Sequence, residues 1–533
     1  MKKRLMALLM CAALLLTASC ALADVDCEKA YGAYEQEVTL TVAKPVVASP
    51  SFGNPDDNQG NNTMTRLIHD RLNIKIDLVW ESDDYANKLA MQIIADDLPD
   101  MFSIPAENYL LYRQLVDNGK LYDLSKLIPE YSGDYLNYIF ESYNNRTLDA
   151  YTEEDGAIYC IAAGNYDYDG HSLLWLRKDW LDALKLDIPK TVEELEKVLI
   201  AFRDNYGSIG LLLSPDSPLG GYGTDYSASP LACALNAYPG TWVKGEDGKL
   251  VYGSLDQGMK GALSTLAKWY QEGLIDQEFA TRTQSSLAAL FTSGQTGAAF
   301  GKWSLCFNIS EFANVEGAEL IAVKCPLNED GTYNVLGPSA LGNMLCVNAK
   351  CKNPEAVLKV MNLEFEAWRG VDKAGYEATN PDRNSRWVAL FPTGGVNMEK
   401  ADALLSSYRA AKEKVETGTI ADESIYTQQE LTNANKSYNY SSGADRSAPM
   451  WIQYHGRYVA PQTFENLNIM YPAFSFTTES MADFWPNLKA LEQTAFLSII
   501  VGDKPVDYFD TFVSEWYAQG GELVMEEVNQ AAR

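Results

Sequence analysis

The sequence predicts an α/β protein built from more than one lobe. Strand-like stretches at 37–47, 74–80 and 98–104 alternate with helical stretches at 64–73 and 85–97. This β-α-β-α-β order favours a parallel sheet whose ligand-binding loops follow the carboxyl ends of the strands. The chain has 533 residues, which is more than a single hydrophobic core usually supports.

The loops after the first two strands carry polar and aromatic candidates for ligand contact. Residues 51–62 are rich in Gly, Pro, Asn and Asp, a composition typical of a loop. Asn54 and Asp57 are ligand-binding candidates in this loop. Asp56 and Asp57 could accept hydrogen bonds from hydroxyl groups of a ligand, although a solvated turn, favoured by Asn54-Pro55, explains them equally well. Trp80 and Tyr85 border the second strand end, where packing at the sheet edge is the competing interpretation for Trp80.

The amino terminus has the features of an export signal. A basic segment at 2–4 precedes a short apolar run, which predicts a signal peptide over 1–19. Cys20 ends the sequence TASC and is the predicted lipidation site, with 20–37 as a tether. Ordinary secretion after the A-x-A motif at 21–23 is the alternative. No other stretch is apolar enough to span a bilayer, so membrane contact is expected through the lipid anchor alone.

The charge of the chain excludes one class of partner. The formal net charge is −29, whereas 47% of the residues are hydrophobic and 22% are charged, as in ordinary globular proteins. A surface this negative repels phosphate backbones and anionic headgroups. We therefore expect no nucleic-acid partner.

Cysteine usage indicates neither a zinc site nor a dense disulfide framework. Seven of the nine cysteines lie beyond the export segment, and no CxxC pair has zinc spacing. Buried free thiols are the main expectation, with a Cys346–Cys351 disulfide as an open alternative. We expect no metal and no cofactor.

The middle of the chain is predicted to be scaffold. A strand runs into a helix within 172–184, and Pro189 then interrupts the helical pattern. Thr191 has the chemistry of a helix N-cap, and Glu194 stands three positions later as a capping-box partner. Nothing in this segment predicts catalysis.

Several segments together resemble one known family. They are GAIYCIAAGNYDYDGHSLLWLRKDWLDALKLDIPKTVEELEKVLIAF (156–202), LFTSGQTGAAFGKWSL (290–305), LPDMF (98–102), CKNPEAVLKVMN (351–362) and the carboxyl-terminal stretch 502–533. In their order along the chain they resemble the extracellular solute-binding proteins of ABC importers, in the carbohydrate-binding family that includes maltose-binding protein. The stretch RDNYGSIG stands where larger relatives often have a calcium-type loop, so no metal site is expected there.

The resemblance implies a two-lobed, periplasmic-binding-protein-like fold with a ligand cleft between the lobes. Lobe 1 is expected to hold 38–165 with 338–375, and lobe 2 to hold 166–337 with 376–533. It also implies a monomeric receptor that binds a carbohydrate and delivers it to an ABC permease in the membrane. The residues alone support only a polar, uncharged ligand with faces that aromatic rings can cover.

The family resemblance also ranks the site candidates. Trp303 follows AAFGK, where the similar element places an aromatic ring under a sugar; a core tryptophan is the alternative. Further candidates flank the inferred lobe crossing or lie in glycine-rich and aromatic loops: Tyr166, Tyr168, His171, Tyr222 and Trp451.

A secreted glycoside hydrolase is the rival function. That chemistry needs two carboxylates about 5–10 Å apart across the scissile bond. The acidic residues here mostly follow helix faces, and no HExxH, GxSxG or P-loop motif occurs. We therefore expect a binding protein rather than an enzyme.

Overall fold

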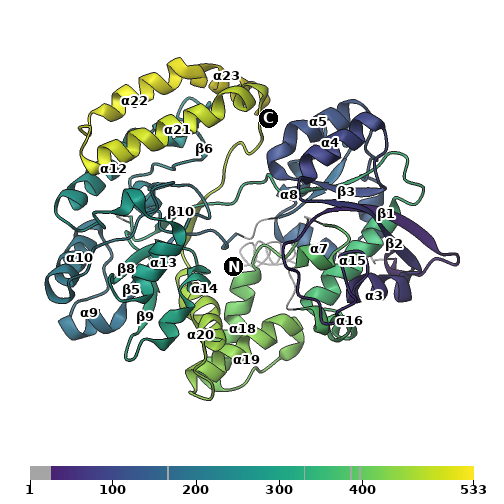
Figure 1. Cartoon of the computed structure of the whole chain (residues 1–533), viewed down its shortest axis with the longest axis horizontal. Helices are drawn as coiled ribbons and strands as arrows, with labels where there is room; N and C mark the ends of the chain where they lie inside the picture. The colour runs from purple at the N-terminus through teal and green to yellow at the C-terminus, as the bar shows by residue number, and fades with distance from the viewer. Residues whose placement is uncertain are drawn as a thin grey trace, which may run out of the picture.

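A computed structural model describes residues 26–164, 167–328, 330–383, 387–394, 396 and 398–532. The signal peptide and Cys20 lie outside these residues, as does Tyr166. Helices and strands fall into two lobes on opposite sides of the molecule (Figure 1). None of the helices in these ranges combines the length and the apolarity needed to cross a membrane.

The first lobe is organised around a five-stranded sheet in the order β2-β1-β3-β11-β4. β1 runs parallel to β2 and β3, whereas β11 runs antiparallel to β3 and β4. Its elements are α2 (Cys27–Tyr31), β1 (Val38–Pro45), α3 (Thr63–Leu72), β2 (Ile74–Ser82), α4 (Tyr85–Ala95), β3 (Met101–Ile104), α5 (Tyr109–Asp117), α6 (Leu127–Tyr131), α7 (Asp134–Ser142), α8 (Arg146–Asp149), β4 (Cys160–Ala162), β11 (Met344–Val347), α15 (Glu355–Arg369), α16 (Lys373–Ala378) and α17 (Trp387–Leu390). The predicted β-α-β-α-β order and the parallel pairing are confirmed.

Both faces of this sheet are buried at β3, β11 and β4. Along β11, Leu345 and Val347 join one hydrophobic cluster, while Met344 and Cys346 join another. Successive side chains of a strand point to opposite faces, so the two clusters lie on the two sides of the sheet. This double burial explains why β3, β11 and β4 are apolar almost throughout, whereas the edge strand β2 alternates buried with exposed residues.

The second lobe contains the three-stranded sheet β8-β5-β9, the pairs β10-β12 and β6-β7, and most of the remaining helices. Its elements are β5 (Leu173–Arg177), α9 (Lys178–Leu184), α10 (Val192–Tyr206), α11 (Ser229–Cys233), β6 (Trp242–Lys244), β7 (Leu250–Tyr252), α12 (Gln257–Gln271), α13 (Gln284–Thr292), β8 (Ala298–Gly301), α14 (Leu305–Asn308), β9 (Leu320–Val323), β10 (Tyr333–Leu336), α18 (Ala403–Thr417), α19 (Gln428–Ser441), α20 (Ala448–Tyr454), the π-helix η7 (His455–Val459), β12 (Leu467–Met470), α21 (Glu479–Val501), α22 (Tyr508–Trp516) and α23 (Glu522–Ala531).

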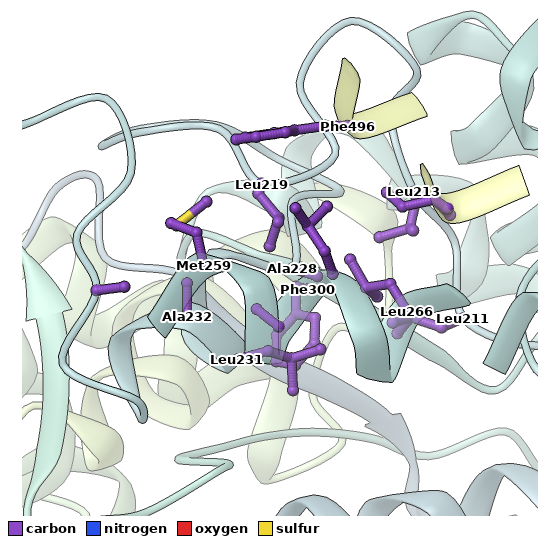
Figure 2. Packing of buried hydrophobic residues seen from close by; sticks show 14 of the residues in the cluster. Leu211, Leu213, Leu219, Ala228, Leu231, Ala232, Met259, Leu266, Phe300 and Phe496 are labelled. Carbon is purple, nitrogen blue, oxygen red and sulfur yellow. The ribbon is translucent and has the colours of Figure 1, made fainter. Parts of the chain in front are cut away.

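The core of the second lobe joins strand, helix and carboxyl-terminal residues. Leu211, Leu231, Met259 and Phe300 pack together with Phe496 of α21 (Figure 2). Helices α21 to α23 therefore close over a core formed by much earlier parts of the chain. In Figure 1 they lie along the outer edge of this lobe, in yellow.

The helix start predicted at Thr191 is present, but the capping box is not complete. The Thr191 hydroxyl accepts a hydrogen bond from the Glu194 amide at 3.2 Å, as an N-cap should. The Glu194 carboxylate instead accepts from the amide of Lys190, at 2.7 Å. The Glu194 side chain thus accepts a hydrogen bond from the residue before the N-cap rather than from the N-cap residue, Thr191.

The chain passes between the lobes at three places in the described residues: between β4 and β5, between β10 and β11, and just before α18. Leu390, Phe391 and Met398 pack in the same cluster as Leu40 of β1, whereas Leu404 packs with the second lobe. We propose that the lobe boundaries follow these clusters. This assigns 376–401 to the first lobe, whereas the sequence placed it in the second.

Candidate ligand-binding site

A cavity of about 570 Å³ opens where β1 and β2 end. The two strands are parallel, and Pro45 pairs with Ser82 at their carboxyl ends, so the loops that follow leave from one edge of the sheet. The lining residues come mainly from the loop after β1: Val46, Val47, Pro50, Ser51, Phe52, Asn54, Pro55, Asp57, Asn58, Gln59, Leu78 and Glu81. Asn54 and Asp57 therefore line a cavity at this edge of the sheet, and their contact with a ligand stays a prediction.

The Asp57 carboxylate already has partners in this loop and in α3. Its carboxylate is nearly inaccessible and forms a two-pronged ion pair with Arg66, at 2.8 and 2.9 Å. The Asn54 side-chain amide donates to the same carboxylate at 3.1 Å. These bonds fix Asp57 in the lining of the cavity, and its contact with a ligand stays a prediction.

Two buried charges attach the cavity loop to the segment around α17. Asp382 accepts hydrogen bonds from the Gly53 amide, the Thr63 amide and the Thr63 hydroxyl, at 2.7, 3.0 and 2.6 Å. The Lys44 ammonium donates to the Ala389 carbonyl at 2.8 Å, and burial lowers the pKa of Lys44 to about 7. The position of the loop therefore depends on residues more than three hundred positions later in the chain.

A second set of candidates meets at the first lobe crossing. We call Tyr168, His171, Tyr222 and Phe464 the crossing cluster. The Tyr168 ring stacks on Phe464 with centroids 5.0 Å apart, and His171 meets Tyr168, Tyr222 and Phe464 edge to face. Gly170 is required here, because a Cβ atom at this position would lie 2.5 Å from the Tyr222 ring.

His171 is buried and neutral within the crossing cluster. Only 1% of the residue is exposed, and burial lowers its pKa to about 3. Both ring nitrogens are buried, and neither has a hydrogen-bond partner among the residues that the structure describes. A charged imidazole would be costly among three aromatic rings, so His171 does not supply a positive charge at neutral pH.

Charged residues border the crossing cluster. Arg146 of α8 forms an ion pair with Asp167, and its guanidinium lies 4.3 Å from the centroid of the Tyr471 ring. The charges of Asp169 and Asp167 contribute to raising the pKa of Tyr222, although burial is the larger cause. Two tyrosines, two carboxylates and an arginine from both lobes therefore share one region.

Trp303 lies beside this region but is covered. Only 7% of the residue is exposed, and its indole nitrogen donates to Asp169 at 3.0 Å. The guanidinium of Arg457 lies 4.3 Å from the ring centroid. Gly456 approaches so closely that a Cβ atom there would be 3.3 Å from the ring. In this structure Trp303 is part of the core, and stacking on a ligand would require Arg457 to leave the ring.

Asp225 adds a second carboxyl group near Trp303. It accepts the Lys302 amide at 2.9 Å, and burial raises its pKa, with a smaller contribution from Asp169. Two adjacent residues thus donate to two carboxylates: the Lys302 amide to Asp225 and the Trp303 indole to Asp169. Among the described residues, no group of three or more His, Cys, Asp or Glu side chains is arranged to hold a metal ion.

The remaining candidates lie elsewhere. Trp80 packs at 5.3 Å from Tyr85 beneath the Lys88 ammonium, and both rings belong to a first-lobe cluster. Trp451 is buried and stacks on His455 at 4.1 Å, beside a separate depression of about 270 Å³. The structure therefore separates Trp80 and Tyr85 from the crossing cluster, whereas Trp451 shares a hydrophobic cluster with Phe464 and Tyr168. Contact of these three candidates with a ligand stays a prediction.

A comparison with known families decides the class of the protein. The family described as bacterial extracellular solute-binding protein matches residues 57–363, which is more than half of the chain. The chain belongs to the bacterial extracellular solute-binding proteins. The resemblance seen in the sequence is thereby confirmed, as is the two-lobed α/β fold.

Relatives within this family are described as binding proteins rather than enzymes. The chain is 21% identical over 471 residues to the polygalacturonan/rhamnogalacturonan-binding protein YtcQ of Bacillus subtilis, covering 86% of each chain. It is 26% identical over 245 residues to the fructooligosaccharide ABC transporter substrate-binding protein FusA of Streptococcus pneumoniae, covering 44% of this chain and 45% of FusA.

Solved structures of solute-binding proteins share the fold. FusA in complex with kestose aligns with a TM-score of 0.58 at 18% identity, covering 92% of this chain and 98% of FusA. An extracellular solute-binding protein from Bifidobacterium longum subsp. infantis aligns with a TM-score of 0.60 at 16% identity, covering 93% and 97%.

Sequence reasoning missed several residues of this solute-binding protein that border the crossing. Asp169 was inside the quoted NYDYDGH segment, so the sequence contained a signal for it. The other four residues lie in helices and loops outside that segment, where no local pattern marks them: Arg146, Phe464, Tyr471 and Arg457. Only the tertiary structure brings them to it.

Proposed function

We propose that this protein is the sugar-binding receptor of an ABC importer, that it takes up an oligosaccharide between its lobes, and that it delivers the ligand to a membrane permease. The observation that carries the proposal is the gathering of aromatic rings and carboxylates at the lobe crossing. Tyrosine rings cover the apolar faces of pyranose or furanose rings, while carboxylates accept hydrogen bonds from hydroxyl groups. The family and the names of its relatives support the same function.

The charges at the crossing favour a neutral ligand. Arg146 is paired with Asp167, and the carboxylates of Asp169 and Asp225 lie nearby. An oligosaccharide of uronic acids would bring more negative charge to a region whose arginine is already compensated. We therefore expect neutral oligosaccharides to bind more tightly than galacturonate oligomers.

The cavity at the ends of β1 and β2 is proposed to bind part of the ligand. Its lining combines Asn, Asp and Gln side chains with the apolar surfaces of Val47, Phe52 and Leu78. Its volume of about 570 Å³ is within the range of small-molecule sites. Asn54 and Gln59 would then hydrogen-bond hydroxyl groups of the ligand.

We further propose that a lipid on Cys20 keeps the receptor beside its permease and that the receptor acts as a monomer. A relative over 92% of both chains carries the name lipoprotein LipO, at 20% identity. Mass spectrometry of the native amino terminus tests the anchor. A mature chain that begins at Asp24 would contradict it and support secretion.

A ligand screen tests the proposed function. Thermal melting of the mature protein is measured with neutral oligosaccharides and with galacturonate oligomers, because a ligand that binds only the folded state raises the melting temperature. Positive ligands are then titrated by calorimetry and incubated with the protein, and products are followed by chromatography. Turnover at enzyme-like rates, or no response to any carbohydrate, would contradict the proposal.

A matched pair of tyrosine variants locates the site. Tyr471 is 36% exposed at the crossing, and Tyr517 is 38% exposed on the carboxyl-terminal helices. We expect Tyr471→Ala to weaken sugar binding by roughly tenfold, since a lost aromatic contact and its buried area are worth about 1.5 kcal/mol. Tyr517→Ala should bind like the wild type. Equal affinities of both variants would move the site away from the crossing.

A further inference from the structure

Two cysteines far apart in the sequence face each other in the first-lobe sheet. Cys160 of β4 and Cys346 of β11 are direct partners in the antiparallel register. Both are at most 1% exposed, and both belong to the same hydrophobic cluster. Directly opposed residues of an antiparallel pair point to the same face, so the two thiols are neighbours on that face.

The backbone hydrogen bonds show which kind of antiparallel pair Cys160 and Cys346 form. Of the two kinds, it is the one with the shorter Cα separation. The Ala163 amide donates to the Asn343 carbonyl at 2.8 Å, so the ladder has a hydrogen-bonded pair at that step. The two kinds of pair alternate along the strands, and Cys160 and Cys346 are three steps away. They therefore form a non-hydrogen-bonded pair, for which a Cα separation of about 4.5 Å is usual. A disulfide accepts Cα separations of about 4.4–6.8 Å.

The alternative expected from the sequence, a Cys346–Cys351 bond, is wrong for this fold. Cys351 packs with Leu345 and Val347 on one face of the sheet, whereas Cys346 packs on the other face. All seven described cysteines are free thiols in the structure, and all but Cys27 are buried, as the sequence mainly predicted. Four of them lie outside the cluster that holds Cys160 and Cys346: Cys27, Cys233, Cys306 and Cys325.

We propose that Cys160 and Cys346 form a disulfide across β4 and β11 when the chain folds in the presence of a low-molecular-weight disulfide such as cystine. A thiolate of one cysteine attacks cystine, which forms a mixed disulfide and releases one cysteine. The second thiolate then attacks the protein sulfur of the mixed disulfide and displaces the second cysteine. Two electrons pass from the protein pair to cystine, and the two thiol protons end on the released cysteines.

The bond forms while β11 is pairing with β4 and before the lobe closes over it. In the folded protein burial raises the pKa of both thiols, which leaves little thiolate to react. Cystine added to the reduced, folded protein should therefore react slowly, whereas refolding with cystine should be efficient.

The proposed bond would join two strands of the first lobe, each of which borders a segment that passes between the lobes. β4 precedes the crossing to β5, and β11 follows the crossing from β10. A cross-link between residues this far apart restricts the unfolded chain strongly, so it should stabilise the first lobe. This inference does not depend on the identity of the ligand.

Peptide mapping of the mature chain tests the proposal. The protein is refolded with a cystine–cysteine mixture, free thiols are alkylated in denaturant, and peptides are compared with and without reduction. We expect a peptide that contains Cys160 linked to one that contains Cys346, and an intact mass two hydrogens below that of the reduced chain. Complete alkylation of both cysteines after such refolding would overturn the proposal.

Variants supply a second readout. The oxidised wild type should melt several degrees above the same protein treated with a phosphine reductant. Cys160→Ala/Cys346→Ala should show no such shift, whereas Cys233→Ala, which removes another buried thiol, should keep it. The wild-type peptide map decides the question if the double variant does not fold. A reductant-dependent shift that persists in a folded double variant would contradict the assignment.

Discussion

The ring of Tyr109 stacks on the ring of Phe476, with centroids 4.7 Å apart and planes 28° apart. Tyr109 belongs to α5 of the first lobe, and Phe476 lies in the segment that leads into α21 of the second. Phe476 also packs against the hydrophobic clusters of both lobes. The pair therefore connects the two lobes directly, beside the crossings that the ligand is proposed to reach.

The Tyr109–Phe476 pair is expected to be energetically coupled. Aromatic pairs contribute about 0.5–1.5 kcal/mol beyond the area they bury, so the effects of Tyr109→Ala and Phe476→Ala on the free energy of unfolding should not add. A double-mutant cycle measured by chemical unfolding checks this. Strictly additive effects would show that the contact does not stabilise the arrangement of the lobes.

Replacing Trp303 should separate packing from ligand contact. Because the ring is 93% buried, Trp303→Ala is expected to lower the free energy of unfolding by about 3–5 kcal/mol. Trp303→Phe keeps most of the packing but removes the donor to Asp169, and we expect it to fold and to bind sugar roughly tenfold more weakly.

Trp180 supplies the matched control for Trp303. It is also 7% exposed and also lies under an arginine, Arg177, whose guanidinium is 4.5 Å from the ring centroid. Trp180→Phe should therefore lose similar stability while sugar affinity stays at the wild-type value. If Trp303→Phe binds as tightly as Trp180→Phe, Trp303 is a core residue only.

The pH dependence of stability should reveal the buried, neutral His171. Its pKa is about 3 in the folded state against an ordinary value near 6.5, so the unfolded chain takes up a proton first as the pH falls. The folded state loses stability from this group below pH 6.5. Between pH 7 and pH 5 the loss amounts to about 2 kcal/mol.

His171→Leu should remove that contribution. Relative to the wild type, the variant should gain about 2 kcal/mol of stability between pH 7 and pH 5, measured by chemical unfolding at both values. Tyr168→Phe changes the neighbouring ring without removing a histidine and should follow the wild-type pH dependence. An unchanged difference between His171→Leu and the wild type at the two pH values would show that His171 is protonated in the fold.

Asp382 should control the cavity at the ends of β1 and β2. Asp382→Asn keeps the shape but turns an amide group toward either the Gly53 amide or the Thr63 donors, because the two oxygens of Asp382 accept from different residues, so we expect a loss of about 1–3 kcal/mol in stability. The loop should loosen, and the Kd for sugar should rise roughly threefold to tenfold. Asp330→Asn is the control, since Asp330 also accepts from the amide and the hydroxyl of one threonine, Thr332, but within an exposed turn. Wild-type affinity in a destabilised Asp382→Asn protein would exclude the cavity from the site.

Local features of the fold were predictable because they are encoded within a few neighbouring residues. The alternation of strands and helices over 38–104 follows from hydrophobic periodicity, and the helix start at Thr191 follows from cap chemistry. The family resemblance rested on several such segments in a fixed order. The crossing of the chain near NYDYDGH and the contact of Tyr168 and His171 with a ligand stay predictions.

The sequence by itself thus determined the α/β class, the two lobes and the solute-binding family. Only the tertiary structure decided that Arg457 covers Trp303, that Leu390, Phe391 and Met398 share a core with β1, and that Cys160 rather than Cys351 faces Cys346. The physical reason is the range of the interactions. Periodicity and capping act over a few positions of the chain, whereas ring burial and strand register depend on which distant segments pack together, and no local pattern of residues specifies that choice.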